Sequence, residues 1–472
     1  MRCQERDDLE RGDAPLPAPI RSTRRARRPS FVLRASGLPQ TTRLVACGSA
    51  IAVREVMGRP FDRFRGGAER RRLRRAAAAR RLATTLGELK GPFAKAGQFA
   101  SLRYDLLAPD LREPFAMLQD RVPPRPFAEI ESLVEAELGA PLGAHFREFE
   151  REPLGAASVA QVHRARLAKD DVVVAVKVQY GWLARSLPAD LALARWLLRV
   201  LVRSGGAAGA ARDRLFDEFA AGLAEELDFE REARVAGEIA ANLAHDDRVV
   251  VPEIHHELST RRVLVMSWVP AIPIGDPTAL AARGIPIPDV LATLARAYAK
   301  QVFVDGLFHA DPHPGNLFVV DEPDAAVRPR VLFLDFGLSK RLDPVLRREM
   351  RLGIHALLRR DVEGFLDGME RMGMIARGAR EGVRAAVAAM FDRIAAEGQV
   401  LGLGGGQVLA LKDHAKRLLG ETPGLQLPND LLLYAKTLSY LFAIGDALDP
   451  GVDLMRLTVP YLLRFLAERD PS

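Results

Sequence analysis

Apolar residues recur at helical spacing in the first third of the chain. Within 68–104 they repeat at steps of three to five residues, which predicts an amphipathic helix that Pro92 breaks or kinks. Residues 127–138 show the same spacing and are followed by Gly139, so they predict a second helix with a defined end. Residues 1–40 are rich in Pro, Arg and Asp without sustained periodicity, and they predict a mobile tail.

The spacing then changes to that of strands. Residues 159–167 and 172–178 are short runs rich in Val, joined by a Lys-Asp-Asp turn, which predicts a β-hairpin. Residues 187–202 and 214–243 return to helical spacing, with a stretch rich in Gly and Ala between them. Another Val-rich strand is predicted at 262–269, where prolines end it.

The last part of the chain is mostly helical in pattern. A helix is predicted at 289–306, two short strands at 317–320 and 331–334, and helices from Pro344 to the end. This order is that of an α+β, protein-kinase-like two-lobed fold with a helical N-terminal extension and extra C-terminal helices. The predicted division is a basic tail, a helical extension, an N-lobe, a catalytic C-lobe core and a C-terminal helical region, at 1–67, 68–145, 146–269, 270–343 and 344–472.

Composition limits the class of protein. The 472 residues are 48% hydrophobic and 27% charged, which is typical of a globular chain. The only cysteines are Cys3 and Cys47, so a disulfide framework and a four-cysteine metal site are excluded, and a reducing compartment is favoured. No stretch of about 18 residues lacks charge, so no transmembrane helix is predicted. Five acids within residues 1–13 argue against a secretory or organellar leader.

Positive charge is concentrated near the N-terminus. Between residues 21 and 81, eighteen arginines face three acids, although the whole chain carries only +7. The charge is therefore not spread over a nucleic-acid groove, and no specific nucleic-acid partner is predicted. Basic helices bind anionic lipid at about 1 kcal/mol per residue, so the arginines of 70–81 predict contact with an anionic membrane surface. A solvated tail or a non-specific polyanion binder is the alternative.

Lysine is rare, at nine of 68 basic residues, so each lysine is a candidate for a specific role. Lys177 ends the run Val-Ala-Val-Lys on a buried type of strand. From such a place a lysine can reach the phosphate oxygens of a nucleotide. The alternative is a strand-end lysine that extends its ammonium group to solvent.

The segment 309–316, His-Ala-Asp-Pro-His-Pro-Gly-Asn, has the spacing of a kinase catalytic loop. Asp311 would orient or deprotonate the attacking hydroxyl or water, and Asn316 would be a neutral oxygen ligand for a hard cation. Nineteen residues after Asn316, Asp335 begins Asp-Phe-Gly and is predicted to be the principal Mg²⁺ ligand. The order of lysine strand, catalytic loop and Asp-Phe-Gly indicates phosphoryl transfer.

His309 and His313 have the i,i+4 spacing of a zinc pair. Pro312 and Pro314 make a helix there implausible, so zinc is not predicted. His309 is instead expected to hydrogen-bond the backbone of the loop.

No glycine-rich phosphate loop precedes the lysine strand. A loop rich in alanine takes its place, and its methyl groups restrict both the approach of a phosphate and the flexibility of the backbone. We therefore expect it to hold a nucleotide differently from a protein kinase. The predicted nucleotide-binding residues of this loop are Gly155, Ala156, Ala157, Ser158 and Val159.

The chain resembles the UbiB/AarF family of atypical kinases, which includes the coenzyme Q kinase-like proteins. The resemblance runs from about residue 91 to 340, roughly half of the chain. Its specific motifs are the alanine loop, a K-x-G-Q signature, an E-x-D signature and a glutamate that pairs with the strand lysine. Here these are 155–159, Lys95-Ala96-Gly97-Gln98, Glu226-Leu227-Asp228 and Glu232. The chain departs from the family at Gly155, where another alanine is usual, and at Ser267, where an acid is common.

The resemblance implies roles for these residues. Lys177 and Glu232 would position the phosphates, and the backbone of the hinge at Met266 and Trp268 would hold adenine. Lys95, Gly97, Gln98, Glu226 and Asp228 would restrict access to the pocket. If 214–243 is one helix, its periodicity directs Glu226 to a different partner from Asp228 and Glu232.

The implied activity is that of an ATP- or ADP-binding, Mg²⁺-dependent ATPase or phosphotransferase. It would support isoprenoid-quinone (ubiquinone) or other membrane-lipid metabolism together with lipid-biosynthesis enzymes. The expected location is the cytoplasm, peripheral on the inner face of a membrane. One alternative is a small-molecule phosphotransferase, which shares the catalytic loop but lacks the K-x-G-Q and E-x-D signatures. Another is a non-catalytic regulator on a membrane surface that is switched by nucleotide.

Overall fold

The structure of the protein is a computed structural model. It describes residues 42, 46–50, 53–54, 57, 67–89, 95, 124–201, 206–322, 325–396, 422 and 424–468. Residues 1–41 of the predicted tail lie outside the described residues, as do Gly97 and Gln98, whereas the described residues 46–50, 53–54 and 57 of the tail are helical. The predicted N-terminal helix is confirmed where it is described, as α2 (Gly67–Leu89).

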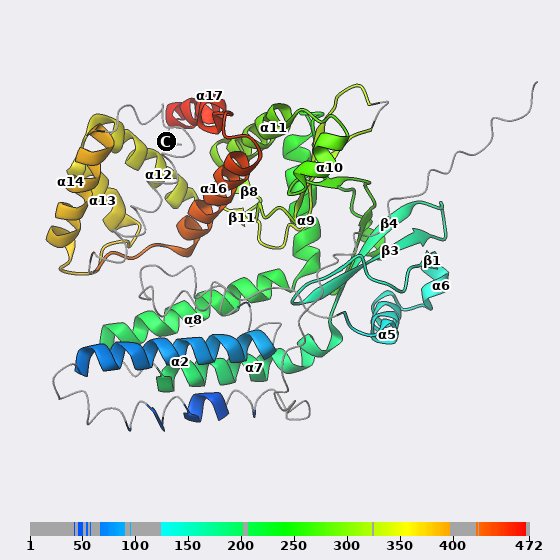
Figure 1. Ribbon diagram of the computed structural model, residues 1–472, viewed down its shortest axis with the longest axis horizontal. Helices are drawn as coiled ribbons and strands as arrows, with labels where there is room; N and C mark the ends of the chain where they lie inside the picture. Colours follow the sequence, from blue (N-terminus) through cyan, green and yellow to red (C-terminus); the bar gives the residue numbers. More distant parts are fainter. Residues whose placement is uncertain are drawn as a thin grey trace, which may run out of the picture. The chain divides into compact units, whose positions relative to one another are not determined.

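The N-lobe is built on an antiparallel five-stranded sheet (Figure 1). The strand order is β1-β3-β4-β6, with β2 paired to β3, and the predicted hairpin is β3 and β4. Every second side chain of β4 is a fully buried valine, packed against the predicted helix α5 (Phe127–Leu138), which ends at Gly139 with φ +71°. The strands are β1 (Phe146–Phe149), β2 (Gly155–Ala156), β3 (Ala160–Leu167), β4 (Val173–Gln179) and β6 (Val263–Ser267).

Three helices lie between β4 and β6 in the sequence, and they correct the prediction of a single helix over 214–243. The chain forms α7 (Gly181–Leu201), α8 (Gly206–Glu226) and α9 (Phe229–Leu243), so the predicted helix is broken after Glu226. Asp228 leaves helical geometry, with φ −105° and ψ 92°, and its carboxylate accepts a hydrogen bond from the Arg231 backbone N–H at 2.8 Å. An aspartate that caps a helix in this way satisfies a backbone donor that would otherwise have no partner.

Helix α9 is shared by the cores of both lobes. Near its start, Phe229 and Ala233 pack against N-lobe side chains such as Tyr180 and Leu264. Its later residues, Ala236, Ile239 and Leu243, are buried among C-lobe side chains. Glu232, on the first turns of α9, is therefore fixed between the two lobes.

The C-lobe combines helices with short strands. The predicted helix 289–306 is α11 (Ile287–Ala299) continued by a π-helical segment (Lys300–Asp305), which Gly306 ends at φ +65°. The four-stranded sheet has the order β5-β10-β9-β7, and the predicted strands β9 and β10 are antiparallel. The strands are β5 (Val249–Val250), β7 (Ile272–Pro273), β8 (Leu307–Phe308), β9 (Leu317–Val320), β10 (Arg330–Phe333) and β11 (Lys340–Arg341).

The helical C-terminal region is confirmed where it is described. Its helices are α12 (Pro344–Arg359), α13 (Val362–Arg371), α14 (Arg380–Ala396), α16 (Asn429–Leu448) and α17 (Leu454–Ala467). Two short helices lie earlier in the chain, α6 (Leu142–His145) and α10 (Pro277–Ala282). Within the described ranges, α16 alone is long and apolar enough to cross a membrane, judged by length and composition. Leu441, Phe442 and Ile444 of α16 are buried in the C-lobe core, so this helix packs as part of the lobe.

Candidate active site

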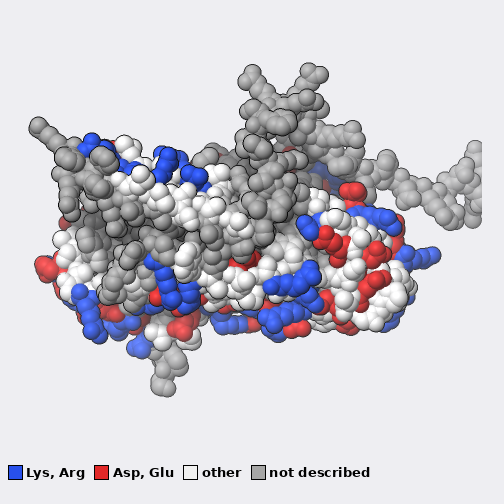
Figure 2. Space-filling view, turned by 90° about the horizontal axis from the view of Figure 1, so that it is seen from below, with Lys and Arg blue, Asp and Glu red and all other residues white. Residues whose placement is uncertain are grey.

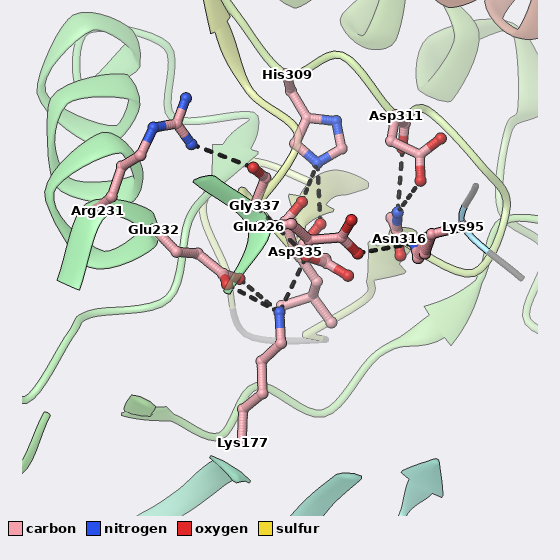
Figure 3. A network of polar contacts seen from close by, with 11 residues as sticks. Lys95, Lys177, Glu226, Arg231, Glu232, His309, Asp311, Asn316, Asp335 and Gly337 are labelled. Carbon is pink, nitrogen blue, oxygen red and sulfur yellow. Dashed lines mark hydrogen bonds and ion pairs between the residues drawn. The ribbon is translucent and has the colours of Figure 1, made fainter. Parts of the chain in front are cut away.

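The strand lysine sits at the centre of a buried ion-pair cluster (Figure 3). The Lys177 ammonium donates to both carboxylate oxygens of Glu232, at 2.8 and 2.9 Å, and to Asp335 Oδ1 at 3.0 Å. These three residues come from β4, α9 and the loop after β10. The side chains of Lys177 and Glu232 are 13% and 2% exposed, whereas that of Asp335 is 49% exposed. Asp335 is therefore the member of the cluster that a ligand can reach.

Burial and charge separate the two acids of this cluster. Burial raises the pKa of Glu232 to about 7, although Lys177 opposes the shift. Partial desolvation would also raise the pKa of Asp335, but the charges of Lys177 and Lys95 outweigh it and lower the pKa to about 2. Asp335 thus stays ionised at any physiological pH. The pKa of Lys177 is raised because its two carboxylate partners outweigh its burial.

Asp335 has an unusual backbone conformation that His309 supports. Its φ of +62° is uncommon outside glycine, although Asp tolerates it better than most residues. The buried His309 Nε2 lies 3.0 Å from Leu334 O and 2.9 Å from Asp335 O, so this nitrogen donates to the loop backbone. The Tyr298 hydroxyl lies 3.0 Å from the other ring nitrogen, and burial lowers the pKa of His309. The expected structural role of His309 is confirmed.

Asp311 and Asn316 of the catalytic loop contact each other. The Asn316 side-chain amide donates to Asp311 Oδ2 at 3.0 Å and to Asp311 O at 3.2 Å. Because Nδ2 faces Asp311, the amide oxygen of Asn316 is the atom left to bind a cation. Among the described residues, no group of three or more His, Cys, Asp or Glu side chains is placed to hold a metal ion.

A third lysine at the site was missed by sequence reasoning. Lys436 of α16 donates to Asp311 Oδ1 at 3.0 Å, across 125 residues of sequence. Its side chain is 20% exposed and that of Asp311 is 23% exposed. The signal that could have found Lys436 is its rarity, because it is one of only nine lysines in the chain.

Arg231 holds the backbone that follows Asp335. The Arg231 guanidinium donates to Gly337 O at 3.2 Å (Figure 3). It also donates to Ser339 O at 2.9 Å. Glu225 pairs with Arg231 at 3.3 Å and with Lys340 at 2.6 Å. The start of α9 and the end of α8 therefore clamp the Asp-Phe-Gly loop.

The predicted gating residues are only partly brought together. Lys95 and Glu226 form an ion pair at 2.7 Å, and both side chains are less than 20% exposed. Glu226 also lies beside the Asp-Phe-Gly loop. Its Cγ is close enough to Gly337 that a Cβ at that position would contact it, at 3.9 Å. Asp228 is used as the cap of α9 instead. Glu226 and Glu232 do face different partners, as predicted, but they do so from two helices.

The alanine loop is closed by its own hydrogen bonds. Gly155 and Ala156 pair with β3, and the Ala157 N–H donates to Ala160 O at 2.8 Å. The Tyr180 hydroxyl donates to Ala157 O at 3.1 Å, and the Tyr180 N–H donates to Val159 O at 3.0 Å. This turn has fewer backbone donors to offer a phosphate than an open glycine loop.

The hinge prediction needs one correction. The Trp268 N–H donates to Val173 O at 3.0 Å. Since the sheet uses this donor, adenine would have to be held by other backbone groups around Met266 and Trp268.

The two lobes and the converging lysine, aspartates and asparagine define a kinase-like protein. Residues 117–368 match the family model of the ABC1 atypical kinase-like domain, which is more than half of the chain. The chain belongs to this family, and the resemblance to UbiB/AarF proteins is confirmed.

Two curated relatives align over most of this chain. It is 30% identical over 441 residues to "Protein ACTIVITY OF BC1 COMPLEX KINASE 8, chloroplastic" of Arabidopsis thaliana, covering 86% of this chain and 57% of that protein. It is 33% identical over 402 residues to protein sll0095 of Synechocystis sp., covering 82% of this chain and 68% of that protein. This chain therefore spans little more than half the length of the Arabidopsis relative.

Among solved structures, the chain is similar to that of the Rv3197–erythromycin complex from Mycobacterium tuberculosis. The identity is 24% and the TM-score is 0.46, over 79% of this chain and 96% of that one.

Proposed function

We propose that this protein binds ATP with Mg²⁺ and transfers or hydrolyses its terminal phosphoryl group. The observation that carries the proposal is the placement of Lys177 between Glu232 and Asp335, at 2.8 to 3.0 Å. Lysine fixed by a helix glutamate beside the Asp-Phe-Gly aspartate is the arrangement that phosphoryl transfer by kinases requires. Lys177 would bind phosphate oxygens, and Asp311 would accept the proton of the attacking hydroxyl or water.

The donor set around Asp335 suits magnesium. A reachable carboxylate on Asp335 and the amide oxygen of Asn316 are hard oxygen ligands. Mg²⁺ at nucleotide sites is usually held by one or two protein oxygens, with phosphates and water completing its shell. When bound, the ion would supply charge neutralisation at the phosphates. The lowered pKa of Asp335 keeps this carboxylate ionised and ready for the cation.

Restricted access favours ATP hydrolysis or a small acceptor over protein phosphorylation. The Lys95–Glu226 pair lies against the Asp-Phe-Gly loop, and the charge of Lys95 acts on Asp335. We propose that this contact limits the entry of large acceptors and that the activity supports isoprenoid-quinone or other membrane-lipid metabolism. Lipid-biosynthesis enzymes are the proposed partners.

The described surface carries both signs of charge, and its arginine-rich helix α2 is proposed to contact a membrane. Basic and acidic side chains are interspersed over the described part of the face in Figure 2. Helix α2 is rich in arginine and exposes Arg70 and Arg72. We propose that α2 binds an anionic membrane surface peripherally, because several adjacent arginines add their attraction to lipid headgroups.

The experiment that tests the function is Mg²⁺-dependent ATP turnover, measured with and without anionic liposomes, beside Asp335→Asn and Lys95→His. Turnover that liposomes stimulate and Asp335→Asn abolishes supports the lipid-coupled enzyme. Turnover indifferent to lipid directs the search to soluble acceptors, as for a small-molecule phosphotransferase. Nucleotide binding without turnover in any condition contradicts the enzyme and supports the nucleotide-switched regulator.

Breaking the gating pair is expected to open the site. Lys95→Met or Glu226→Gln should raise turnover about threefold, and the double variant should add little, because coupled residues share one interaction energy. Lys340→Met is the matched control, since Lys340 pairs with the neighbouring Glu225 and is equally exposed at 19%. If Lys340→Met raises turnover as much as Lys95→Met, the gating role is wrong.

The raised pKa of Glu232 predicts how nucleotide affinity depends on pH. As pH falls through about 7, Glu232 gains a proton and its pair with Lys177 weakens. Titrations of ADP between pH 8 and 6 should therefore show affinity falling about threefold more in the wild type than in Glu232→Gln. Parallel profiles for the two proteins would contradict this assignment, because titration of the nucleotide itself affects both equally.

A further inference from the structure

The helix α16 presses one face onto the catalytic loop. Lys436 donates to Asp311 Oδ1 at 3.0 Å, and the Thr437 hydroxyl donates to Ala310 O at 3.1 Å. One turn further, the Tyr440 ring lies 6.1 Å from that of His313, edge to face. Tyr440 lies four positions after Lys436 and three after Thr437, so it borders both of them on the helix surface. The catalytic loop is therefore braced by a helix that lies outside the family-matched residues 117–368.

The ammonium group of Lys436 is held in a defined place. Asp311 Oδ1 is on one side, and the Tyr440 ring lies 5.6 Å away on another. Asn316 uses the other oxygen of the same carboxylate, Oδ2. An ammonium group has three donors, so Lys436 retains donors beyond the one given to Asp311. At 20% exposure it is still within reach of a ligand.

We propose that Lys436 is a positioning residue for the terminal phosphoryl group of the nucleotide. It fixes the Asp311 carboxylate from Oδ1 and places a positive charge where the nucleophile, held by Asp311, meets the phosphoryl group. Charge that develops there in the transition state is stabilised by a cation already in position. This inference rests on the proposed function, since it requires the acceptor to lie beside Asp311.

The rival explanation is that the Lys436–Asp311 pair only anchors α16 to the lobe. The chain offers a matched pair to separate the two explanations. Lys300 and Asp305 are 2.7 Å apart, with side chains 16% and 9% exposed, and both lie on the π-helical segment that follows α11. Like Lys436→Met, Lys300→Met breaks an ion pair between a mostly buried lysine and an aspartate. It leaves Asp311 of the catalytic loop unchanged.

The test compares the affinity for Mg²⁺-ADP with that for a non-hydrolysable β,γ-imido analogue of ATP in the full chain. Lys436→Met is expected to weaken binding of the analogue about fivefold, with ADP affinity within about twofold of wild type, because only the analogue carries the terminal phosphoryl group. Turnover should fall about 10- to 100-fold in kcat, and the KM for ATP should rise about fivefold, in step with the affinity for the analogue. Lys436→Arg should recover part of both losses. Lys300→Met should lower the thermal midpoint comparably and change neither quantity.

Two results would overturn the inference. One is an unchanged ratio of analogue to ADP affinity in a folded Lys436→Met protein. The other is a loss that Lys300→Met reproduces. If the wild type shows no turnover with any acceptor, the proposed function fails, but the ratio of affinities still decides whether Lys436 senses the terminal phosphoryl group.

Discussion

Asp335→Asn is expected to lower Mg²⁺-dependent ATP turnover by about a thousandfold while the protein stays folded. The substitution keeps the shape of the side chain but removes the charge that would bind the cation. Asparagine also tolerates the φ of +62° at this position, so the loop should not rearrange. Because the cation is lost, nucleotide affinity should also become nearly independent of Mg²⁺. Steady-state turnover and Mg²⁺ titration of nucleotide binding measure the two effects.

The control for this prediction is Asp171→Asn. Asp171 also has a φ of +62°, its side chain is 53% exposed, and it pairs with Arg147 and Arg166 in the β3–β4 turn. It thus matches Asp335 in backbone, exposure and chemistry, away from the site. Asp171→Asn should turn over ATP at the wild-type rate. An Asp335→Asn protein as active as Asp171→Asn would refute the metal assignment.

Asp311→Asn is expected to lower kcat by about 10²- to 10⁴-fold, the range for removal of a general base. The amide cannot accept the proton of the attacking hydroxyl or water. It would also leave Lys436 without its carboxylate partner. Unlike Asp335→Asn, this variant should keep its Mg²⁺-dependent affinity for nucleotide, because Asp311 is not a proposed metal ligand. Single-turnover kinetics and nucleotide titration separate the two contributions.

The control for the second prediction is Asp305→Asn. Asp305 pairs with Lys300 at 2.7 Å, as Asp311 pairs with Lys436 at 3.0 Å. Both variants lose an aspartate from a partly buried ion pair, so both should destabilise the fold to a similar extent. Only Asp311→Asn should slow turnover. Equal slowing in both variants would mean that Asp311 acts through stability alone.

Much of the fold follows from local patterns. Alternating valines predict β4, and Gly139 marks the end of α5, because burial on one face of a sheet and a left-handed C-cap each leave a local signature. The interval between Asp311 and Asn316 likewise matches a kinase catalytic loop, and a short loop keeps the two side chains in contact. These features depend on neighbours only a few residues away.

The prediction of one helix over 214–243 failed for a physical reason. Leu223 and Leu227 keep helical spacing up to the break, so periodicity gives no sign of it. An aspartate can face solvent within a helix or cap the next one, and the two choices differ only in where the chain turns. Here the turn sends the start of α9 into the N-lobe core through Phe229. Tertiary packing therefore determines that Asp228 caps α9.

The sequence by itself determined which chemical groups the protein has and the family to which it belongs. The tertiary structure decided which charges meet. It brings Lys177 to Glu232 across 55 residues and to Asp335 across 158, and it joins Lys436 to Asp311 across 125. Periodicity and motif spacing report only on neighbours along the chain. Ion pairs over such intervals form because buried charges require partners and the folded core places them within reach.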